Sequence, residues 1–274
     1  MKFAKWHGLG NDFVIVNTLE EAICNERELA VAVCDRHFGI GADGLVLLGP
    51  SDVADAQMRI VNSDGSYAEM CGNATRCIAR YMEKNGLNRS DTIKLETASG
   101  IVEPRLLPGA DKLVEVNMGR ARLLRSEIPM TGAPNDTAIN VNLDVNNWRW
   151  TGTGVSMGNP HFVIFVENLA QIDLTEWGPR IEKHPMFPRR ANIEFVQRLS
   201  ASKVRMRVWE RGCGITLACG TGSCATCVAG VLTHRTGREI TVVLDGGELI
   251  VRYEPDGVVM MTGPASEVFT GNWN

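Results

Sequence analysis

The sequence has no long hydrophobic run and no large excess of charge of either sign. Its most apolar segments, such as Phe162–Val166, are far shorter than the roughly 20 residues that a membrane-spanning helix needs. The 28 basic and 32 acidic residues are scattered, without the basic clusters typical of proteins that bind nucleic acid or anionic membranes. No apolar segment follows Met1, which favours a cytoplasmic location. These absences leave a small molecule as the expected partner, with no nucleic acid and no membrane.

Motifs that bind the common cofactors are also missing. No Gly-x-Gly-x-x-Gly follows a predicted strand, no phosphate-binding loop is present, and no lysine stands in a context typical of a pyridoxal site. We therefore expect chemistry that needs neither a cofactor nor a metal. What the chain does contain is 274 residues with 44% hydrophobic content, which is enough for two cores of ordinary domain size.

The chain contains eight cysteines. In a reducing compartment they are expected to be thiols rather than a disulfide framework. Most buried cysteines are small apolar fillers, and we assign that role to four of them: Cys24, Cys34, Cys77 and Cys227. Two others, Cys71 and Cys219, stand at corresponding points of an internal repeat.

Several unlike motifs occur twice in the same order and at nearly one spacing. Gly10-Asn11-Asp12-Phe13 returns as Gly158-Asn159-Pro160-His161, and Cys71-Gly72 returns as Cys219-Gly220. The offset is 148 residues for both the asparagines (159 − 11) and the cysteines (219 − 71). Ordered matches of this kind indicate two homologous half-domains. We expect the N-terminal half-domain to comprise residues 1–117 with 263–274, and the C-terminal half-domain to comprise residues 118–262.

The predicted secondary structure consists of many strands and few helices. Apolar or alternating segments predict strands over 13–17, 45–48, 58–61, 114–116 and 204–209. Helices are predicted over 73–84, ending at Asn85-Gly86, and over 221–234, ending near Gly237, where glycine suits a left-handed cap. Each helix directly follows a Cys-Gly pair. The expected fold class is therefore α/β (α+β), with two pseudo-symmetric halves, each a strand-rich, barrel-like sheet around one central helix.

The start of each helix is suited to proton transfer. Unpaired N–H groups and the helix dipole place positive charge there, which lowers the pKa of a thiol from about 8.5 toward neutrality. The N–H groups of the residues that follow can hold a substrate carboxylate: Gly72, Asn73, Gly220 and Thr221. A carbanion formed at an α-carbon spreads its charge onto that carboxylate, where each well-placed donor contributes about 3–4 kcal/mol. Two thiols on opposite sides of one carbon, Cys71 and Cys219, would invert its configuration.

These motifs resemble those of the diaminopimelate epimerase family, and the resemblance runs nearly from end to end. It is carried by His7-Gly8-Leu9-Gly10-Asn11-Asp12-Phe13, Asn62-Ser63-Asp64-Gly65 before Met70-Cys71-Gly72-Asn73, Gly158-Asn159-Pro160-His161, and Trp209-Glu210-Arg211-Gly212 before Ala218-Cys219-Gly220-Thr221-Gly222. It implies a cofactor-independent epimerase that interconverts LL- and meso-diaminopimelate, in lysine and peptidoglycan precursor biosynthesis. One cysteine would act as thiolate base and the other as thiol acid, depending on the stereoisomer bound.

The resemblance also implies roles for individual residues. Six residues would line the substrate pocket: Asn11, Asn62, Asn159, Asn192, Glu210 and Arg211. The second amino-acid centre of diaminopimelate needs a cation for its carboxylate and acceptors for its ammonium, and four of these residues are of the right types: Arg211, Glu210, Asn62 and Asn192. His161 and Glu210 would help to determine how many protons are held near the two thiols. Family members are commonly homodimers, and Phe269 stands where an aromatic residue makes a dimer contact in some relatives.

Three departures and two alternatives stay open. Gly44 stands where some relatives have a longer polar side chain, and Cys213 and Ile215 also differ from the usual residues. A racemase of the same fold could act on another amino acid such as histidine, since the thiol pair alone does not determine the substrate. The chain could also be a structural zinc module, using Cys213, Cys219, Cys224 and Cys227, although these include only one Cys-x-x-Cys.

Overall fold

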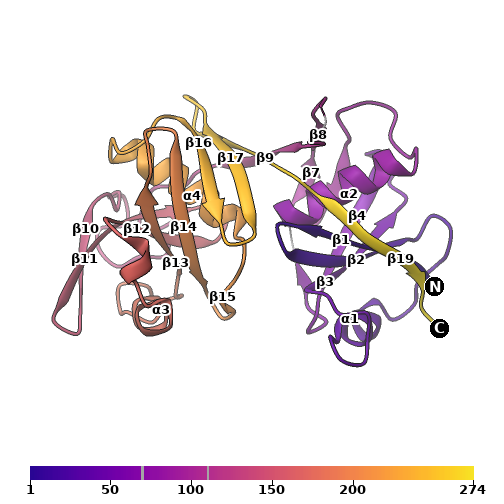
Figure 1. Ribbon diagram of the computed structural model, residues 1–274, viewed down its shortest axis with the longest axis horizontal. Helices are drawn as coiled ribbons and strands as arrows, with labels where there is room; N and C mark the ends of the chain where they lie inside the picture. Colours follow the sequence, from indigo (N-terminus) through magenta and orange to yellow (C-terminus); the bar gives the residue numbers. More distant parts are fainter. Residues whose placement is uncertain (69–70, 110) are drawn as a thin grey trace. The chain divides into compact units, whose positions relative to one another are not determined.

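The computed structural model describes residues 1–68, 71–109 and 111–274. Its fold is mixed α+β, in which many short strands accompany few helices, so the expected fold class is confirmed (Figure 1). Met70, which belongs to the first Cys-Gly motif, lies outside the described residues. The chain divides into two compact units, Met1–Asn117 with Thr262–Asn274, and Met118–Met261.

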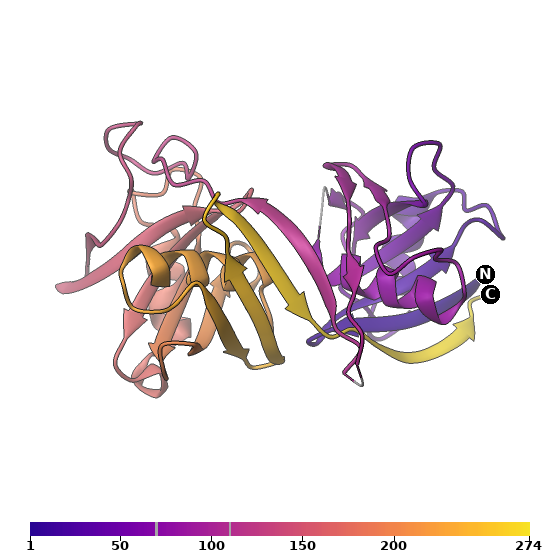
Figure 2. The same ribbon diagram turned by 90° about the horizontal axis from the view of Figure 1, so that it is seen from above.

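The first unit is built on one sheet with the strand order β19-β1-β2-β3-β4-β6-β7, and β5 pairs with β4. Its helices are α1 (Glu26–Cys34) and α2 (Gly72–Lys84). Its strands are β1 (Lys2–Gly8), β2 (Asn11–Asn17), β3 (Gly44–Gly49), β4 (Ala56–Asn62), β5 (Tyr67–Ala68), β6 (Leu95–Thr97), β7 (Gly100–Val102), β8 (Arg105–Leu106), the start of β9 (Val114–Arg120), and β19 (Ser266–Asn272). Because β19 pairs with β1, the last residues complete this sheet, and both views place the two chain ends side by side (Figures 1 and 2).

The second unit contains the strand order β10-β11-β12-β13-β14-β16-β17-β18, and β15 pairs with β14. Its helices are the short η1 (Leu169–Gln171), α3 (Leu174–Glu182) and α4 (Gly220–Leu232). Its strands are β10 (Val141–Val145), β11 (Trp148–Ser156), β12 (Pro160–Val166), β13 (Asn192–Arg198), β14 (Lys203–Glu210), β15 (Gly214–Ile215), β16 (Glu239–Leu244), β17 (Gly247–Tyr253) and β18 (Val258–Gly263).

The two units repeat one connectivity, which is the structural counterpart of the sequence repeat. In the first unit, β2 runs parallel to β3, β3 antiparallel to β4, β4 parallel to β6, and β6 antiparallel to β7. The second unit has the same directions in the same order: β12 runs parallel to β13, β13 antiparallel to β14, β14 parallel to β16, and β16 antiparallel to β17. Helices α1 and α3 stand at one corresponding point of the chain order, and α2 and α4 at another.

Helices α2 and α4 are the central helices that the sequence predicts. They are buried along most of their length, including apolar residues such as Ile78 and Val228, as expected of a core helix. Helix α2 ends as predicted, with Gly86 in the left-handed conformation (φ 65°). Helix α4 is shorter than predicted, because His234 rather than Gly237 adopts the left-handed conformation (φ 56°). The N–H of Arg235 then donates to Gly230 O at 2.8 Å and closes the helix.

The sequence analysis did not predict α1 or α3. Helix α3 holds Gly178 and Pro179 in its interior, which local propensity disfavours. It forms because Asp173 caps its first turn and because Gly178 lets the Trp209 ring lie against it. A Cβ at Gly178 would come within 2.5 Å of that ring. The apolar core under this helix includes Phe162 and other fully buried aromatic side chains.

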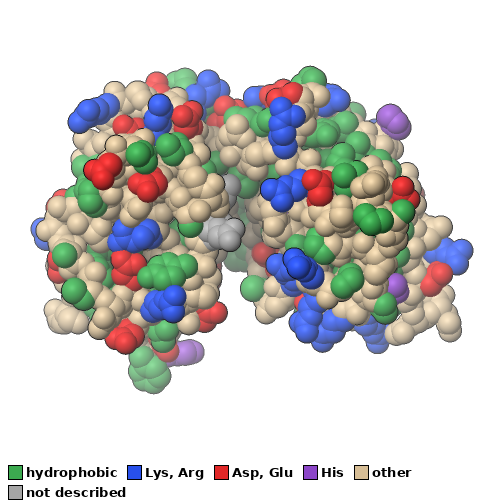
Figure 3. All heavy atoms as spheres, turned by 180° about the vertical axis from the view of Figure 1, so that it is seen from behind, with side chains coloured by type: hydrophobic (Ala, Val, Ile, Leu, Met, Phe, Trp, Pro, Cys, Tyr) green, Lys and Arg blue, Asp and Glu red, His purple; other side chains and the backbone are tan. Residues whose placement is uncertain are grey.

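In the ranges that the structure describes, no helix is long and apolar enough to cross a bilayer. On the face shown in Figure 3, acidic and basic side chains occur on both units among hydrophobic ones.

Candidate active site

Cys71 and Cys219 occupy the N-cap positions of α2 and α4, with similar extended backbones (φ −144°, ψ 114° and φ −130°, ψ 108°). The Cys71 carbonyl accepts from the N–H and the hydroxyl of Thr75 at 2.9 and 3.0 Å. The Cys219 carbonyl accepts from the same two groups of Ser223, both at 2.9 Å. The two thiols therefore sit in matching local structures, each directly before the first N–H groups of a helix, which have no partner within that helix.

In the first unit, Asn11 and Asn73 lie beside Cys71. The Cys71 Sγ is 3.9 Å from Asn11 Oδ1, and Asn73 Nδ2 donates to the same oxygen at 3.1 Å. Asn11 Nδ2 donates to Asp43 Oδ2 at 2.8 Å, and this bond turns the amide oxygen of Asn11 toward the thiol. Asp43 is a residue that the sequence reasoning missed.

A buried arginine supports the start of α2. Arg76 is fully buried and donates to Asn73 Oδ1 at 2.6 Å and to Gly72 O at 3.2 Å. A Cβ at Gly8 would lie 2.9 Å from Arg76 Nη2, so a larger residue there would displace this guanidinium. This guanidinium places a fixed positive charge against Gly72 and Asn73, the two residues that follow Cys71.

In the second unit, Asn159 and Thr221 stand beside Cys219 as Asn11 and Asn73 stand beside Cys71. Asn159 Nδ2 donates to Thr221 Oγ1 at 3.3 Å, and that oxygen is 3.6 Å from the Cys219 Sγ. The N–H of Gly222 donates to the same sulfur at 3.3 Å. The repeated sequence motifs thus build a repeated contact, in which an asparagine at the start of a strand meets the second residue after a cysteine.

His161 lies in β12 and is completely buried. Its Nδ1 is 2.7 Å from Glu194 Oε1, and its Nε2 is 3.0 Å from Asn159 Oδ1. Glu194, in β13, is also completely buried and was missed by the sequence reasoning. A signal was available, because Glu194 is the single charged residue in the apolar run 193–196, and carboxylates are rarely buried unless paired.

Glu210 lies at the end of β14, where its carboxylate accepts a hydrogen bond from Thr216 Oγ1. Burial raises the pKa of Glu210, although hydrogen bonds from Thr216 and Cys219 oppose this. Burial, together with the negative charges of Glu210 and Glu194, raises the pKa of the Cys219 thiol well above its ordinary value. The prediction that the helix start lowers this pKa is therefore wrong for Cys219, because desolvation and two carboxylates outweigh the helix dipole.

The remaining predicted residues have other partners. Asn192 is buried, and its amide donates to Pro160 O and accepts from the N–H of Arg211 at 2.8 Å, so it holds the backbone of the Arg211 loop. The side chain of Arg211 is exposed and donates to Arg189 O at 3.1 Å. Asn62 pairs in register with Gly44, and its amide donates to Ser66 Oγ at 2.9 Å within its own turn.

The other cysteines behave in two ways. Cys34, Cys77 and Cys227 are buried as predicted, and burial raises their pKa to about 11, about 12 and about 12. Cys24 is exposed, so the filler prediction is wrong for it. Cys213 is also exposed, and Ile215 is 40% exposed beside it. In the part of the chain that the structure describes, no three His, Cys, Asp or Glu side chains converge as a metal site requires, which argues against a zinc site on Cys213, Cys219, Cys224 and Cys227.

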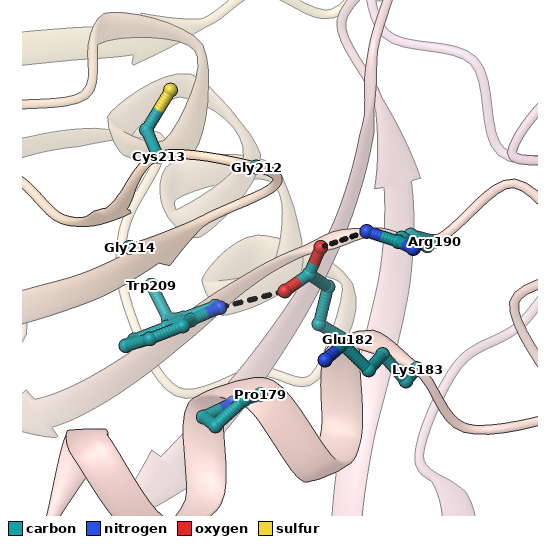
Figure 4. A pocket seen from close by; sticks show the side chains of 8 residues that line it. All are labelled: Pro179, Glu182, Lys183, Arg190, Trp209, Gly212, Cys213 and Gly214. Atoms are coloured by element: carbon teal, nitrogen blue, oxygen red, sulfur yellow. Dashed lines mark hydrogen bonds and ion pairs between the residues drawn. The ribbon is translucent and has the colours of Figure 1, made fainter.

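A separate pocket of about 310 Å³ lies beside α3, and its lining contains none of the predicted substrate-binding residues. Figure 4 shows Glu182 at its centre, where Oε2 accepts from Trp209 Nε1 at 2.8 Å and Oε1 lies 3.6 Å from Arg190 Nη1. Trp209 and Glu210 are adjacent in β14, so their side chains point to opposite faces of the sheet. This pocket is therefore distinct from the surroundings of Cys219.

The chain is similar to known proteins along its whole length. The family model for diaminopimelate epimerase matches residues 3–124 and 153–268. A diaminopimelate epimerase of Pelotomaculum thermopropionicum is 52% identical over 277 residues, covering 100% of this chain and 99% of the relative. One of Moorella thermoacetica is 50% identical over 279 residues, with 100% and 99% covered.

A solved structure with low sequence identity has the same fold. A phenazine biosynthesis protein of the PhzF family from Bacillus anthracis superposes with a TM-score of 0.72 at 16% identity, covering 99% of this chain and 98% of that one. At such identity the likeness concerns the fold alone. The match of the family model and the full-length similarity to curated relatives establish that this chain belongs to the diaminopimelate epimerase family, a family of isomerases.

Proposed function

We propose that this protein interconverts LL- and meso-diaminopimelate by moving a proton at one α-carbon between two thiols, Cys71 and Cys219, without a cofactor. The observation that carries the proposal is the repeated setting of the two cysteines, each the N-cap of a core helix with an asparagine contact beside it. Relatives with half or more of their residues identical over the full length carry the name of this activity. Inversion needs an acid and a base on opposite faces of the carbon, and two equivalent thiols supply them.

In the proposed reaction the substrate carboxylate binds the N–H groups that begin α2 and α4. These donors stabilise the negative charge that develops when the α-proton leaves, and no reorganisation is needed at that moment. Cys219 rests as a protonated thiol, because burial and its two carboxylate neighbours raise its pKa. It is therefore ready to donate a proton, whereas it must first lose its own proton to act as base.

Recognition of the second amino-acid centre is assigned to Asn62, Asn159, Asn192, Glu210 and Arg211. The exposed guanidinium of Arg211 suits the distal carboxylate, because it pairs with two oxygens at once. Asn192 would act through the backbone of Arg211 that it holds. The half-domains 1–117 with 263–274 and 118–262 would each supply one thiol, and the reaction would contribute to lysine and peptidoglycan precursor biosynthesis in the cytoplasm.

The deciding experiment incubates the metal-free protein with LL-diaminopimelate in D₂O, following the meso product and deuterium at the α-carbon. Wild type should form meso product with deuterium at the inverted centre, while Cys71→Ala and Cys219→Ala should lose activity by at least about 100-fold, as expected for loss of an acid–base group. Cys227→Ser is the matched control, since Cys227 lies in α4 but bonds Arg238 O and Val251 O. Turnover of histidine instead of diaminopimelate would favour a racemase, and full activity of either alanine variant would refute the two-thiol mechanism.

The proposal also requires both sulfur atoms to reach one carbon. A mild oxidant that accepts two electrons and two protons should then join Cys71 and Cys219 in a disulfide and inactivate the enzyme, and a thiol reductant should restore it. Peptide mapping that finds no such crosslink after complete oxidation would count against this geometry.

We further propose a homodimer with Phe269 at the contact. This side chain is 45% exposed on β19 and stacks edge-on against Phe3, at 5.9 Å between ring centroids. Phe269→Glu should therefore yield monomers in analytical ultracentrifugation, whereas an unchanged sedimentation coefficient would remove Phe269 from the interface.

A further inference from the structure

Glu194 is a buried carboxylate to which the proposed reaction assigns no contact with substrate and no proton transfer. It lies in β13 between the apolar residues Ile193 and Phe195, and it is completely inaccessible to solvent. Its Oε1 contacts His161 Nδ1 at 2.7 Å, whereas its Oε2 has no hydrogen-bond partner among the residues that the structure describes. Burying such a group is costly unless its charge is compensated, so this position calls for an explanation.

The two ring nitrogens of His161 both face oxygen atoms. Nε2 is 3.0 Å from the amide oxygen of Asn159, which can only accept, so this nitrogen carries a proton. Nδ1 faces a carboxylate oxygen, and a proton must also lie between these two atoms. The His161–Glu194 pair therefore holds two protons and no net charge, which is the form that a fully buried pair tolerates best.

The proton on Nε2 sets the direction of the hydrogen bonds that follow. Because Asn159 Oδ1 accepts from His161, its Nδ2 points the other way and donates to Thr221 Oγ1 at 3.3 Å. A hydroxyl that accepts in this way keeps its own proton for another acceptor, and the Cys219 Sγ lies 3.6 Å away. Without the Nε2 proton the amide would reverse, and its oxygen would take the Thr221 hydroxyl proton away from the sulfur.

We propose that Glu194 is a positioning residue for the reaction at Cys219, because it holds a second ring proton on His161 and thereby makes the Thr221 hydroxyl donate to the Cys219 sulfur. This inference rests on the proposed function. The donated hydrogen bond matters when Cys219 is a thiolate, since a charged sulfur gains more from a donor than a neutral thiol does. Together with the Gly222 N–H, it gives the thiolate two donors.

The packing around Gly222 explains why this arrangement is tight. A Cβ at Gly222 would lie 2.8 Å from Glu194 Oε1 and 3.1 Å from the Cys219 Sγ, so the carboxylate and the sulfur lie against the same glycine. The titratable groups that face each other here come from four elements: His161 of β12, Glu194 of β13, Glu210 of β14 and Cys219 of α4.

The test uses Glu194→Gln, which keeps the shape of the side chain, and Thr221→Val, which keeps the backbone N–H. Each variant should lower kcat for diaminopimelate about ten-fold or more with little change in KM, because the lost bond acts on the thiolate. The double variant should be no slower than the worse single variant, since both changes break one chain of hydrogen bonds. Losses that multiply in the double variant would overturn the proposal.

Glu182→Gln is the matched control. Glu182 is likewise a buried carboxylate of the second unit, but its Oε2 accepts from Trp209 Nε1 and it faces Arg190 in the separate pocket (Figure 4). It should keep wild-type kcat. If Glu194→Gln loses no more activity than Glu182→Gln, Glu194 has no positioning role.

Imidazole ¹⁵N spectra at pH 7 give a readout that does not depend on turnover. Both ring nitrogens of His161 should be of the protonated type in wild type, and one should lose its proton in Glu194→Gln. A wild-type ring with only one protonated nitrogen overturns the inference, even if Glu194→Gln fails to fold. A wild type that puts no deuterium into diaminopimelate instead contradicts the proposed function, while the spectra still decide the state of His161.

Discussion

Replacing Gly222 by alanine tests the packing of the Cys219 site directly. Gly222 lies in the first turn of α4, where alanine ordinarily stabilises a helix by up to about 1 kcal/mol relative to glycine. Here the added methyl group would lie 2.8 Å from Glu194 Oε1, 3.1 Å from the Cys219 Sγ and 3.3 Å from its Cβ. These neighbours belong to a buried ion pair and to the N-cap residue, so neither can move away without breaking its own contacts.

The clash should outweigh the helix propensity. Overpacking of this kind costs roughly 1–3 kcal/mol, so the net loss of stability should reach up to about 2 kcal/mol after a propensity gain of about 1 kcal/mol is subtracted. For a protein of this size each kcal/mol lowers Tm by about 2–4 °C. Activity should fall further than stability suggests, because a sulfur displaced by a few tenths of an ångström is no longer aligned for proton transfer.

Gly230→Ala in the same helix is the matched control. Its Cβ would meet the side chain of Thr236, so a similar loss of stability is expected, but far along the helix from Cys219. Urea unfolding and the D₂O epimerase assay, run on both variants, separate the two effects. A Gly222→Ala protein that is more stable than wild type, or one as active as Gly230→Ala, would refute the reasoning.

Three further predictions concern other parts of the molecule. Glu210→Gln removes the charge of Glu210, so it should lower the raised pKa of Cys219 and speed the alkylation of this thiol by iodoacetamide at pH 8, measured by peptide mass spectrometry. An unchanged rate of alkylation would show that Glu210 does not keep this thiol protonated. Burial raises the pKa of Asp12, but hydrogen bonds from Arg36 and Lys5 outweigh it and lower the pKa from 3.8 to about 2. Asp12 therefore stabilises the fold at neutral pH, and this contribution disappears as the pH falls from about 4 to about 2. Asp12→Asn should remove that part of the dependence of Tm on pH. Identical profiles of Tm against pH for wild type and variant would contradict this. Gly178→Ala should destabilise the second unit by about 1–3 kcal/mol in urea unfolding, because its Cβ would meet the Trp209 ring, and a neutral effect would show that α3 can shift.

Much of the fold follows from local patterns in the sequence. The starts of α2 and α4 lie within one residue of their predictions, and each predicted strand overlaps an observed one, for example β14 over Lys203–Glu210. Helix α3 was not predicted in this way, because Gly178 and Pro179 disfavour a helix, and the packing of Gly178 against Trp209, which is distant in the sequence, offsets them.

The candidate site also has residues that the sequence identifies and contacts that it does not reveal. The repeat identified Cys71, Cys219, Asn11 and Asn159, since it reflects order along the chain alone. It could not indicate that Asp43 orients Asn11, because that contact joins the start of β2 to the residue before β3.

By itself the sequence determined the duplicated architecture, the position of a cysteine at the start of each core helix, and the family. The charge around Cys219 was decided by the tertiary structure, which brings Glu194 from β13 and Glu210 from β14 to a thiol on α4. Capping and periodicity depend on neighbours along the chain, whereas desolvation and charge depend on groups that only folding brings close together.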